Sequence, residues 1–230
     1  YHDFCQFVPT IFKHIAVESL IHGNWQIEHG QQISRAISEV FSHQLSDKNQ
    51  VEIPRLDIQG RGEITIPLSL IEHDHAAVLY FPLPAKDLRM CALTMLTNQL
   101  LSPIFFQQMR TEKQYGYLVG VGFIPINRFP GIAFYIQSPD TNASALTQAM
   151  KDFIAETKEY VSTLSPEDWQ HIQSGLAGQL QEKDNNLRIK SQRSWAALCN
   201  KEACFNQKQK LFTIIEQLSQ DELVEFVETY

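Results

Sequence analysis

The stretch LVGVGFIPINRFPGIAFYIQ, residues 118–137, decides the fold class. Two apolar runs, Leu118–Ile124 and Gly131–Gln137, are separated by the six-residue connection Pro125–Pro130, which contains Asn127. Runs of β-branched and aromatic residues on both sides of a short connection are typical of two paired strands. We therefore predict an antiparallel hairpin at this place.

Two further strands are predicted before the hairpin. Glu63–Ile66 alternates polar and apolar side chains. Ala76–Phe81 is a continuous apolar run of the kind found at the centre of a sheet. These segments would extend the hairpin into a larger sheet.

Helices account for most of the remaining sequence. Apolar side chains recur at helical spacing in three stretches, at positions 88–100, 146–161 and 169–180. Ser165-Pro166 and the Ser219–Glu222 run are sequences that start helices, because the Ser hydroxyl accepts a hydrogen bond from a free amide of the first turn. An antiparallel sheet covered by helices defines an α+β fold.

The first part of the chain has a different pattern. Apolar residues between Phe4 and Ile15 predict the end of an amphipathic helix. Ala16–His22 is predicted to be a short strand, stopped by a glycine–asparagine turn, and Ile33–Leu45 a second helix. Ser46–Arg61 has weak periodicity and is predicted to be a linker.

The composition restricts the class of protein. The 230 residues are 43% hydrophobic and 20% charged, with a formal net charge of −7. This length fits one large domain or one domain with part of another, and such an apolar fraction can form a core. An acidic chain without clustered Lys and Arg is not predicted to bind nucleic acid. No apolar stretch approaches the about 18 residues that cross a bilayer, so no membrane span is predicted.

Two groups of residues were the candidates for a metal site. His73 and His75 would share one face of a strand, which suits zinc, but a polar turn is expected there and no third ligand is evident. His22 and His29, the latter beside Glu28, are seven residues apart with a helix-breaking glycine between them. We therefore predict that His29 is a residue of a first helical turn. Neither HxxEH nor HExxH occurs in the chain, and no metal site is predicted.

Chemistry is more clearly indicated just before the hairpin, in FFQQMRTEKQYGYLV at residues 105–119. A helix is predicted to end near Arg110 and a strand to begin near Tyr117. One interpretation is a plain connector, in which Arg110 faces a helix C-terminus and is stabilised there by about 0.3–1 kcal/mol. The other is a fixed cation and a phenolic donor that bind a carbonyl oxygen as it becomes negative in a transition state.

The run RTEKQYGY, residues 110–117, resembles a motif of the M16 family, the inverted-zincin peptidases that include pitrilysin and insulin-degrading enzyme. The motif, Arg-Thr-x-x-Gln-x-Gly-Tyr, lies in the C-terminal half of those enzymes. Several other segments also resemble the family and follow in the same order, so that the resemblance spans nearly the whole chain: Ser19–Asn24, Glu72–Phe81, Phe105-Phe106 and Ile136–Ser138.

The resemblance implies the LuxS/metallohydrolase-like α+β fold of an M16 domain. It also implies that residues 1–60 end the third family domain and carry the linker, and that residues 61–230 form most of the fourth, without its last strand. In the family, two bowl-shaped halves enclose a chamber, and the N-terminal half holds zinc through HxxEH and a later Glu. Zinc is therefore expected in the full-length enzyme but outside this chain. The implied partners are the N-terminal half of the same polypeptide and peptide substrates.

By position in the motif, the resemblance implies catalytic and substrate-binding roles for Tyr117 and Arg110. Tyr117 would donate a hydrogen bond to the oxyanion, and Arg110 would bind the substrate carbonyl or orient the phenol. Tyr115 departs from the family, which has an aliphatic residue there. Strand alternation predicts that Tyr115 and Tyr117 share a face.

The function implied is peptide-bond hydrolysis by a zinc metalloendopeptidase of which this chain is a part. The chain alone is expected to be inactive, because the Lewis acid and the general base would lie in the other half. One alternative is a non-catalytic M16-fold subunit that binds peptides or supports a partner, and another is an independent metalloprotein that uses His73 and His75. Similarity to bacterial sequences predicts a periplasmic location, with the cytoplasm as the alternative.

Overall fold

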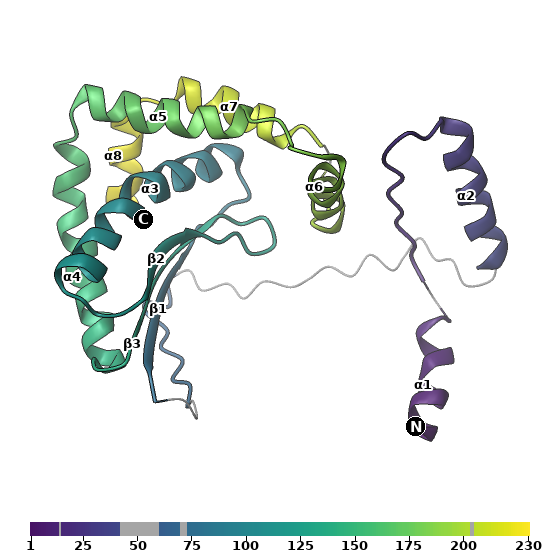
Figure 1. Cartoon of the computed structure of the whole chain (residues 1–230), viewed down its shortest axis with the longest axis horizontal. Coiled ribbons are helices and arrows are strands. Elements are labelled where there is room, and N and C mark those ends of the chain that lie inside the picture. The colour runs from purple at the N-terminus through teal and green to yellow at the C-terminus, as the bar shows by residue number, and fades with distance from the viewer. Residues whose placement is uncertain (14, 42–59, 70–72, 203–204) are drawn as a thin grey trace. The chain divides into compact units, whose positions relative to one another are not determined.

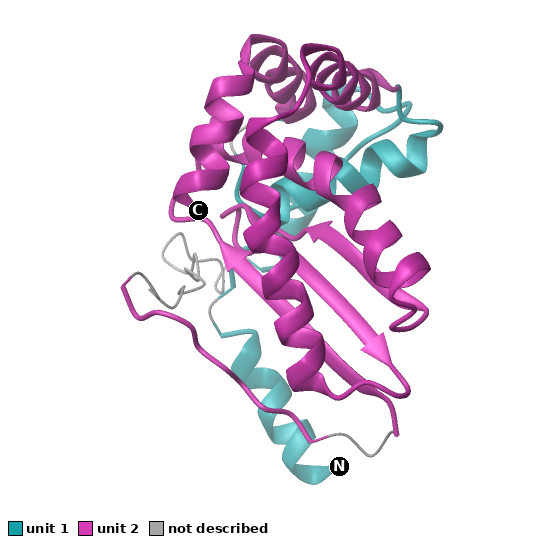
Figure 2. Ribbon diagram, turned by 90° about the vertical axis from the view of Figure 1, so that its left-hand side faces the viewer, with its two compact units in different colours: residues 1–56, 183–205 teal, residues 57–182, 206–230 magenta. Residues whose placement is uncertain are grey.

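The computed structural model describes residues 1–13, 15–41, 60–69, 73–202 and 205–230. The chain divides into two compact units, each built from two stretches of sequence (Figure 2). The first unit comprises Tyr1–Leu56 and Lys183–Phe205, and the second comprises Asp57–Glu182 and Asn206–Tyr230. Most of the predicted linker lies outside the described residues. The assignment of residues 1–60 and 61–230 to successive family domains stays a prediction.

The second unit contains a three-stranded antiparallel sheet in the order β1-β3-β2. Its strands are β1 (His75–Pro82), β2 (Leu118–Phe123) and β3 (Gly131–Ser138). The central strand pairs Phe134 with Leu79 of β1 and with Val121 of β2. The predicted hairpin and the strand at Ala76–Phe81 are therefore confirmed.

The strand predicted at Glu63–Ile66 is wrong, because these residues form no ladder with the sheet. Instead, the Glu63 carboxylate accepts a hydrogen bond from the Lys151 ammonium at 2.7 Å. Four alternating residues suit a strand, but alternation alone does not provide a neighbouring strand with free backbone groups. Here a side-chain ion pair takes the place of backbone pairing.

One face of the sheet is covered by two long helices, α3 (Leu88–Phe106) and α4 (Ala143–Ser162). Three further helices pack beyond or beside α3, as Figure 1 shows: α5 (Pro166–Gln181), α7 (Gln207–Gln217) and α8 (Gln220–Thr229). The α+β class is confirmed. The helical stripes predicted at 88–100, 146–161 and 169–180 coincide with α3, α4 and α5.

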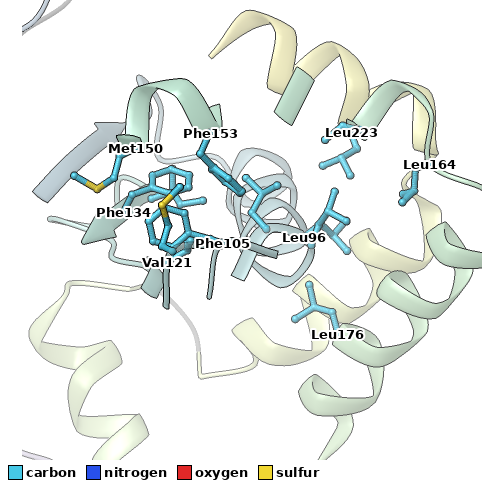
Figure 3. Close-up of a cluster of buried hydrophobic side chains, with 14 of the residues drawn as sticks. Leu96, Phe105, Val121, Phe134, Met150, Phe153, Leu164, Leu176 and Leu223 are labelled. Carbon is cyan, nitrogen blue, oxygen red and sulfur yellow. The ribbon is translucent and has the colours of Figure 1, made fainter. Parts of the chain in front are cut away.

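Three phenylalanines join the sheet to its two covering helices (Figure 3). The ring centroid of Phe105 on α3 lies 5.4 Å from that of Phe134 on β3 and 5.0 Å from that of Phe153 on α4. All three side chains are buried, and Phe105 is completely so. Edge contacts between buried rings add about 0.5–1.5 kcal/mol per pair to the stabilisation from burial itself.

The opposite face of the sheet carries glycines that lie beneath tyrosine rings. A Cβ on Gly120 would lie 2.4 Å from the Tyr135 hydroxyl, and one on Gly131 would lie 2.2 Å from the Tyr80 hydroxyl. The Tyr80 hydroxyl in turn donates a hydrogen bond to the Ile124 carbonyl at 3.0 Å. Gly120 and Gly131 are therefore required by the packing of these two rings.

The first unit contains three described helices, α1 (His2–Ile11), α2 (Ile27–Val40) and α6 (Leu187–Cys199). The strand predicted at Ala16–His22 is wrong, because the described residues of this unit offer no strand to pair with it. Side chains attach the segment to the later part of the unit instead. His22 Nδ1 lies 2.7 Å from the Ser191 hydroxyl on α6, and Glu18 pairs with Lys201.

The predicted helix starts are confirmed at three places. Ser165 accepts a hydrogen bond from the Asp168 amide at the start of α5, with proline at the first helical position. Ser219 and Glu222 form a reciprocal capping box at the start of α8. His29 is the third residue of α2, and its ring accepts a hydrogen bond from the Gln26 amide. Among the described residues, no helix combines the length and the apolar character that a membrane crossing requires.

The cap of α8 makes stability depend on pH. The hydrogen bond from the Ser219 amide, followed by that from the Arg89 guanidinium, holds the pKa of Glu222 below its ordinary value of 4.5. The stabilisation of the fold by ionised Glu222 is therefore fully present above the unfolded-state pKa of this group. It is lost as the pH falls through the lower folded-state pKa.

We expect Glu222→Gln to lower the free energy of unfolding by about 0.5–1 kcal/mol at pH 7, because Gln keeps a capping side chain but loses the charge. The difference from the wild type should shrink as the pH falls below about 4. Urea unfolding followed by circular dichroism measures both effects. Glu225→Gln, on the same helix, is the matched control, and an equal loss in that variant would contradict the prediction.

Candidate functional site

The site begins where α3 changes its winding. The wider turn η1 (Gln107–Glu112) follows α3 without a break, and its end is closed by a hydrogen bond from the Lys113 amide to the Gln108 carbonyl. Such π-helical turns are rare and occur frequently at functional sites. Met109 within the turn is completely buried, which anchors it to the core. The helical stretch therefore continues slightly past Arg110, where the sequence predicts its end.

The connection from η1 to β2 is held by backbone geometry. Gln114 has a φ of 53°, in the left-handed region. The next amide, that of Tyr115, donates a hydrogen bond to the Met109 carbonyl at 3.1 Å. A Cβ on Gly116 would lie only 1.9 Å from the Gln137 carbonyl oxygen on β3. Only glycine fits this close approach of two backbones, so Gly116 sets the path on which Tyr117 lies.

The two residues of the predicted site are in direct contact. The Arg110 Nη1 donates a hydrogen bond to the backbone carbonyl of Tyr117 at 3.0 Å. The guanidinium carbon lies 5.7 Å from the centroid of the Tyr117 ring, within the range of a cation–π contact. None of the ion pairs formed between described residues includes Arg110. Its charge is therefore not neutralised by a carboxylate of the described chain.

The Tyr117 side chain is 86% exposed, and no described hydrogen bond engages its phenol. Tyr115 lies in a different environment, packed against the buried core. The prediction that the two tyrosines share a face is wrong. Strand alternation applies only from Leu118, where β2 begins, and the left-handed residue Gln114 precedes both tyrosines.

The arrangement suits donation of hydrogen bonds to an oxygen that approaches from solvent. A neutral phenol supplies one O–H donor, and a guanidinium supplies five N–H donors together with a permanent charge. Only one of those donors is used in the contact with Tyr117. The pair is therefore available to a carbonyl oxygen or an oxyanion.

His73 and His75, which were considered as zinc ligands, lie at the start of β1. His73 lies in a bend before β1 and His75 is the first residue of that strand, both exposed. Asp74 between them accepts a hydrogen bond from the Gln137 side chain at 2.8 Å. Within the part of the chain that is described, no three His, Cys, Asp or Glu side chains form a group that could hold a metal ion.

One contact was not predicted from the sequence. The Phe106 ring centroid lies 5.1 Å from the Arg110 guanidinium carbon, so that aromatic rings from two elements contact the same cation. The spacing of four residues on a helix is the signal that pairs the two side chains.

Several known proteins are similar to this chain in sequence. Residues 96–195 match the family model described as PQQ synthase PqqF-like, C-terminal lobe domain 4. The chain is 32% identical to coenzyme PQQ synthesis protein F of Pseudomonas protegens over 47% of this chain and 13% of that protein. It is 26% identical to the A-factor-processing enzyme of Saccharomyces cerevisiae over 97% of this chain and 22% of that protein.

Two solved structures show the same fold. Pitrilysin superposes with a TM-score of 0.62 at 23% identity, over 68% of this chain and 17% of that one. A peptidase M16 inactive domain from Pseudomonas fluorescens has a TM-score of 0.60 at 14% identity, over 90% of this chain and 48% of that one.

The fold is the one seen in solved M16 domains, and the family-model match includes the RTEKQYGY run. More particularly, the comparisons support a C-terminal M16 peptidase-like domain, which confirms the resemblance carried by residues 110–117. The chain spans about a quarter of the length of the curated relatives that it matches over nearly its whole length.

The close approach at Gly116 leads to a prediction. We expect Gly116→Ala to lower the free energy of unfolding by about 1–3 kcal/mol, because the added methyl group must push β3 away from the connection. Thermal or urea unfolding of the chain measures the effect. Gly178→Ala in α5 is the control, since nothing lies within 4 Å of a Cβ there. Equal stability of the two variants would show that the backbones can separate without loss.

Proposed function

We propose that this chain is the part of a zinc metalloendopeptidase that binds no zinc itself and supplies Arg110 and Tyr117 to the reaction. The observation that carries the proposal is the exposed phenol of Tyr117 beside the Arg110 guanidinium, which has no acidic partner in the described chain and donates a hydrogen bond to the Tyr117 backbone carbonyl. A residue pair needed only for stability would more commonly be buried or neutralised.

The chemistry requires such donors. When water adds to a peptide carbonyl, the carbonyl oxygen becomes negative and is stabilised by hydrogen-bond donors that are already in place. Tyr117 would donate a hydrogen bond from its phenolic O–H group to this oxyanion. Arg110 would hold the Tyr117 backbone and direct its remaining N–H groups to the substrate carbonyl. The zinc, held by the N-terminal half of the same polypeptide, would supply the activated water.

The remaining parts of the proposal follow from the family resemblance. Residues 1–60 would end the third family domain and residues 61–230 would form most of the fourth. The two halves would enclose peptide substrates in a chamber. A periplasmic location is proposed on the similarity to bacterial M16 proteins, with the cytoplasm as the alternative.

The second candidate function is a non-catalytic M16 subunit that binds peptides or supports a partner. The likeness to a solved domain that carries the name M16 inactive domain favours it. The presence of both donors favours the catalytic function, because peptide binding alone does not require a phenol at an oxyanion position.

The role of the Tyr117 phenol can be tested by removing its oxygen atom. In the full-length protein, we expect Tyr117→Phe to reduce kcat by about 10²–10³-fold, because one oxyanion donor is lost. The assay is cleavage of a quenched fluorescent peptide. Tyr160→Phe makes the same chemical change at a half-exposed tyrosine of α4 and should leave the rate unchanged. Wild-type activity in Tyr117→Phe would assign the oxyanion donor elsewhere.

The division of the site between two halves is tested by reconstitution. This chain alone should not cleave the peptide. Activity should appear when the N-terminal half and zinc are added, and a chelator should abolish it, because the metal and the base enter with that half. Chelator-sensitive cleavage by this chain alone would mean that a complete metal site lies within its residues. Absence of activity in the mixture would favour the non-catalytic function.

A further inference from the structure

An arginine can serve as a fixed donor only if its side chain is restrained. The arginine side chain has many rotamers, and its guanidinium samples many orientations unless neighbouring groups hold it. Arg110 makes one hydrogen bond, to the Tyr117 carbonyl, and no ion pair with a described carboxylate. The hydrogen bond and the Tyr117 ring, whose centroid lies 5.7 Å from the guanidinium carbon, both restrain Arg110 from the side of Tyr117.

The Phe106 ring provides a further restraint, from the end of α3. Phe106 is the last residue of α3, and its ring lies 5.1 Å from the Arg110 guanidinium carbon. That distance is within the about 6 Å over which a ring attracts a cation. The hydrogen bond and the Tyr117 ring lie in the connection that leads into β2, whereas Phe106 contacts Arg110 from the end of α3.

Phe106 is itself held in place by its neighbours. Phe105 is completely buried in the aromatic cluster, and Met109 is completely buried one turn later. These two anchors fix the face of the helix that points inward. Phe106 and Arg110, each one residue further along, are therefore turned together toward the other side, where Phe106 remains 41% exposed. An exposed ring on so well-anchored a turn has a defined position.

We infer that Phe106 is a positioning residue: its ring holds the Arg110 guanidinium against Tyr117, so that both donors act on one carbonyl oxygen. This inference rests on the proposed function for its catalytic consequence, but the contact itself can be tested without activity. In this role the contact that matters is the one between its ring and the Arg110 guanidinium. It acts through Arg110.

The first test follows Arg110 by NMR in this chain. Stacking on a ring shifts the Arg110 side-chain protons upfield. Phe106→Leu, which keeps an apolar side chain but removes the ring, should return them toward the values of an exposed arginine, whereas Phe106→Tyr should retain the shift. Tyr160→Leu, which removes a ring of similar exposure on α4, is the control. Unchanged Arg110 resonances in Phe106→Leu would overturn the inference.

The second test is kinetic and uses the full-length protein. Phe106→Leu should lower kcat about two- to tenfold, in keeping with the strength of one cation–π contact, with little change in KM. Phe106→Tyr should retain the wild-type rate, because it keeps an aromatic ring at this position. In an Arg110→Ala background the same Phe106→Leu change should have no further effect, because a positioning residue acts only through the group it positions.

The outcomes separate the two proposals. If Arg110→Ala and Tyr117→Phe leave kcat unchanged, the proposed function fails, and the NMR result alone then decides whether Phe106 positions the guanidinium. If those two variants lose activity but Phe106→Leu lowers kcat equally with or without Arg110, Phe106 acts by another route. In that case the proposed function stands and this inference is wrong.

Discussion

The packing of Phe105 against Phe134 and Phe153 is the constraint on which the rest of the second unit depends. It ties the end of α3 to the central strand and to α4 at one point. Because a helix has a fixed repeat, burial of one side chain determines which way its neighbours face. Phe105 and Met109 face the core, and consequently Phe106 and Arg110 face outward. The site is thus a consequence of how the core is packed, rather than an addition to it.

The same unit brings its second functional side chain to the site by a different kind of constraint. Tyr117 is placed by backbone contact, since Gly116 lies against the Gln137 carbonyl and Gln114 adopts a left-handed conformation. One donor is therefore positioned by side-chain packing and the other by main-chain geometry. The hydrogen bond from the Arg110 guanidinium to the Tyr117 backbone carbonyl joins the turn η1 to the connection that leads into β2. Arg110, Gly116 and Tyr117 of the RTEKQYGY run thereby each acquire a physical reason, including the glycine that carries no chemistry.

Much of this arrangement could be predicted from the sequence, and the exceptions have identifiable causes. The hairpin, the long helices and the helix starts were predictable, because their patterns are long or involve specific capping residues. The short strands predicted at Ala16–His22 and Glu63–Ile66 were wrong, because a strand requires a partner that a local pattern does not reveal. The proximity of Arg110 and Tyr117 was suggested by family resemblance. The four-residue spacing of Phe106 and Arg110 could have indicated their contact, whereas the π-helical turn depends on a local winding that no sequence pattern indicates.

The division of the chain into units has a consequence for the order of folding. The contacts of the first unit join residues far apart in sequence: His22 bonds to Ser191, 169 residues later, and Glu18 to Lys201, 183 residues later. During synthesis, these partners emerge only after the whole sheet and the helices α3 to α5 have left the ribosome. These two contacts of the early segment can therefore form only after the residues of the aromatic cluster in the second unit have been synthesised. Closing so long a loop is entropically unfavourable and slow, and it is less so once the intervening chain is already compact. Neither unit can therefore be completed early: the first requires α6 and Lys201, and the second requires α7 and α8, which are synthesised later still.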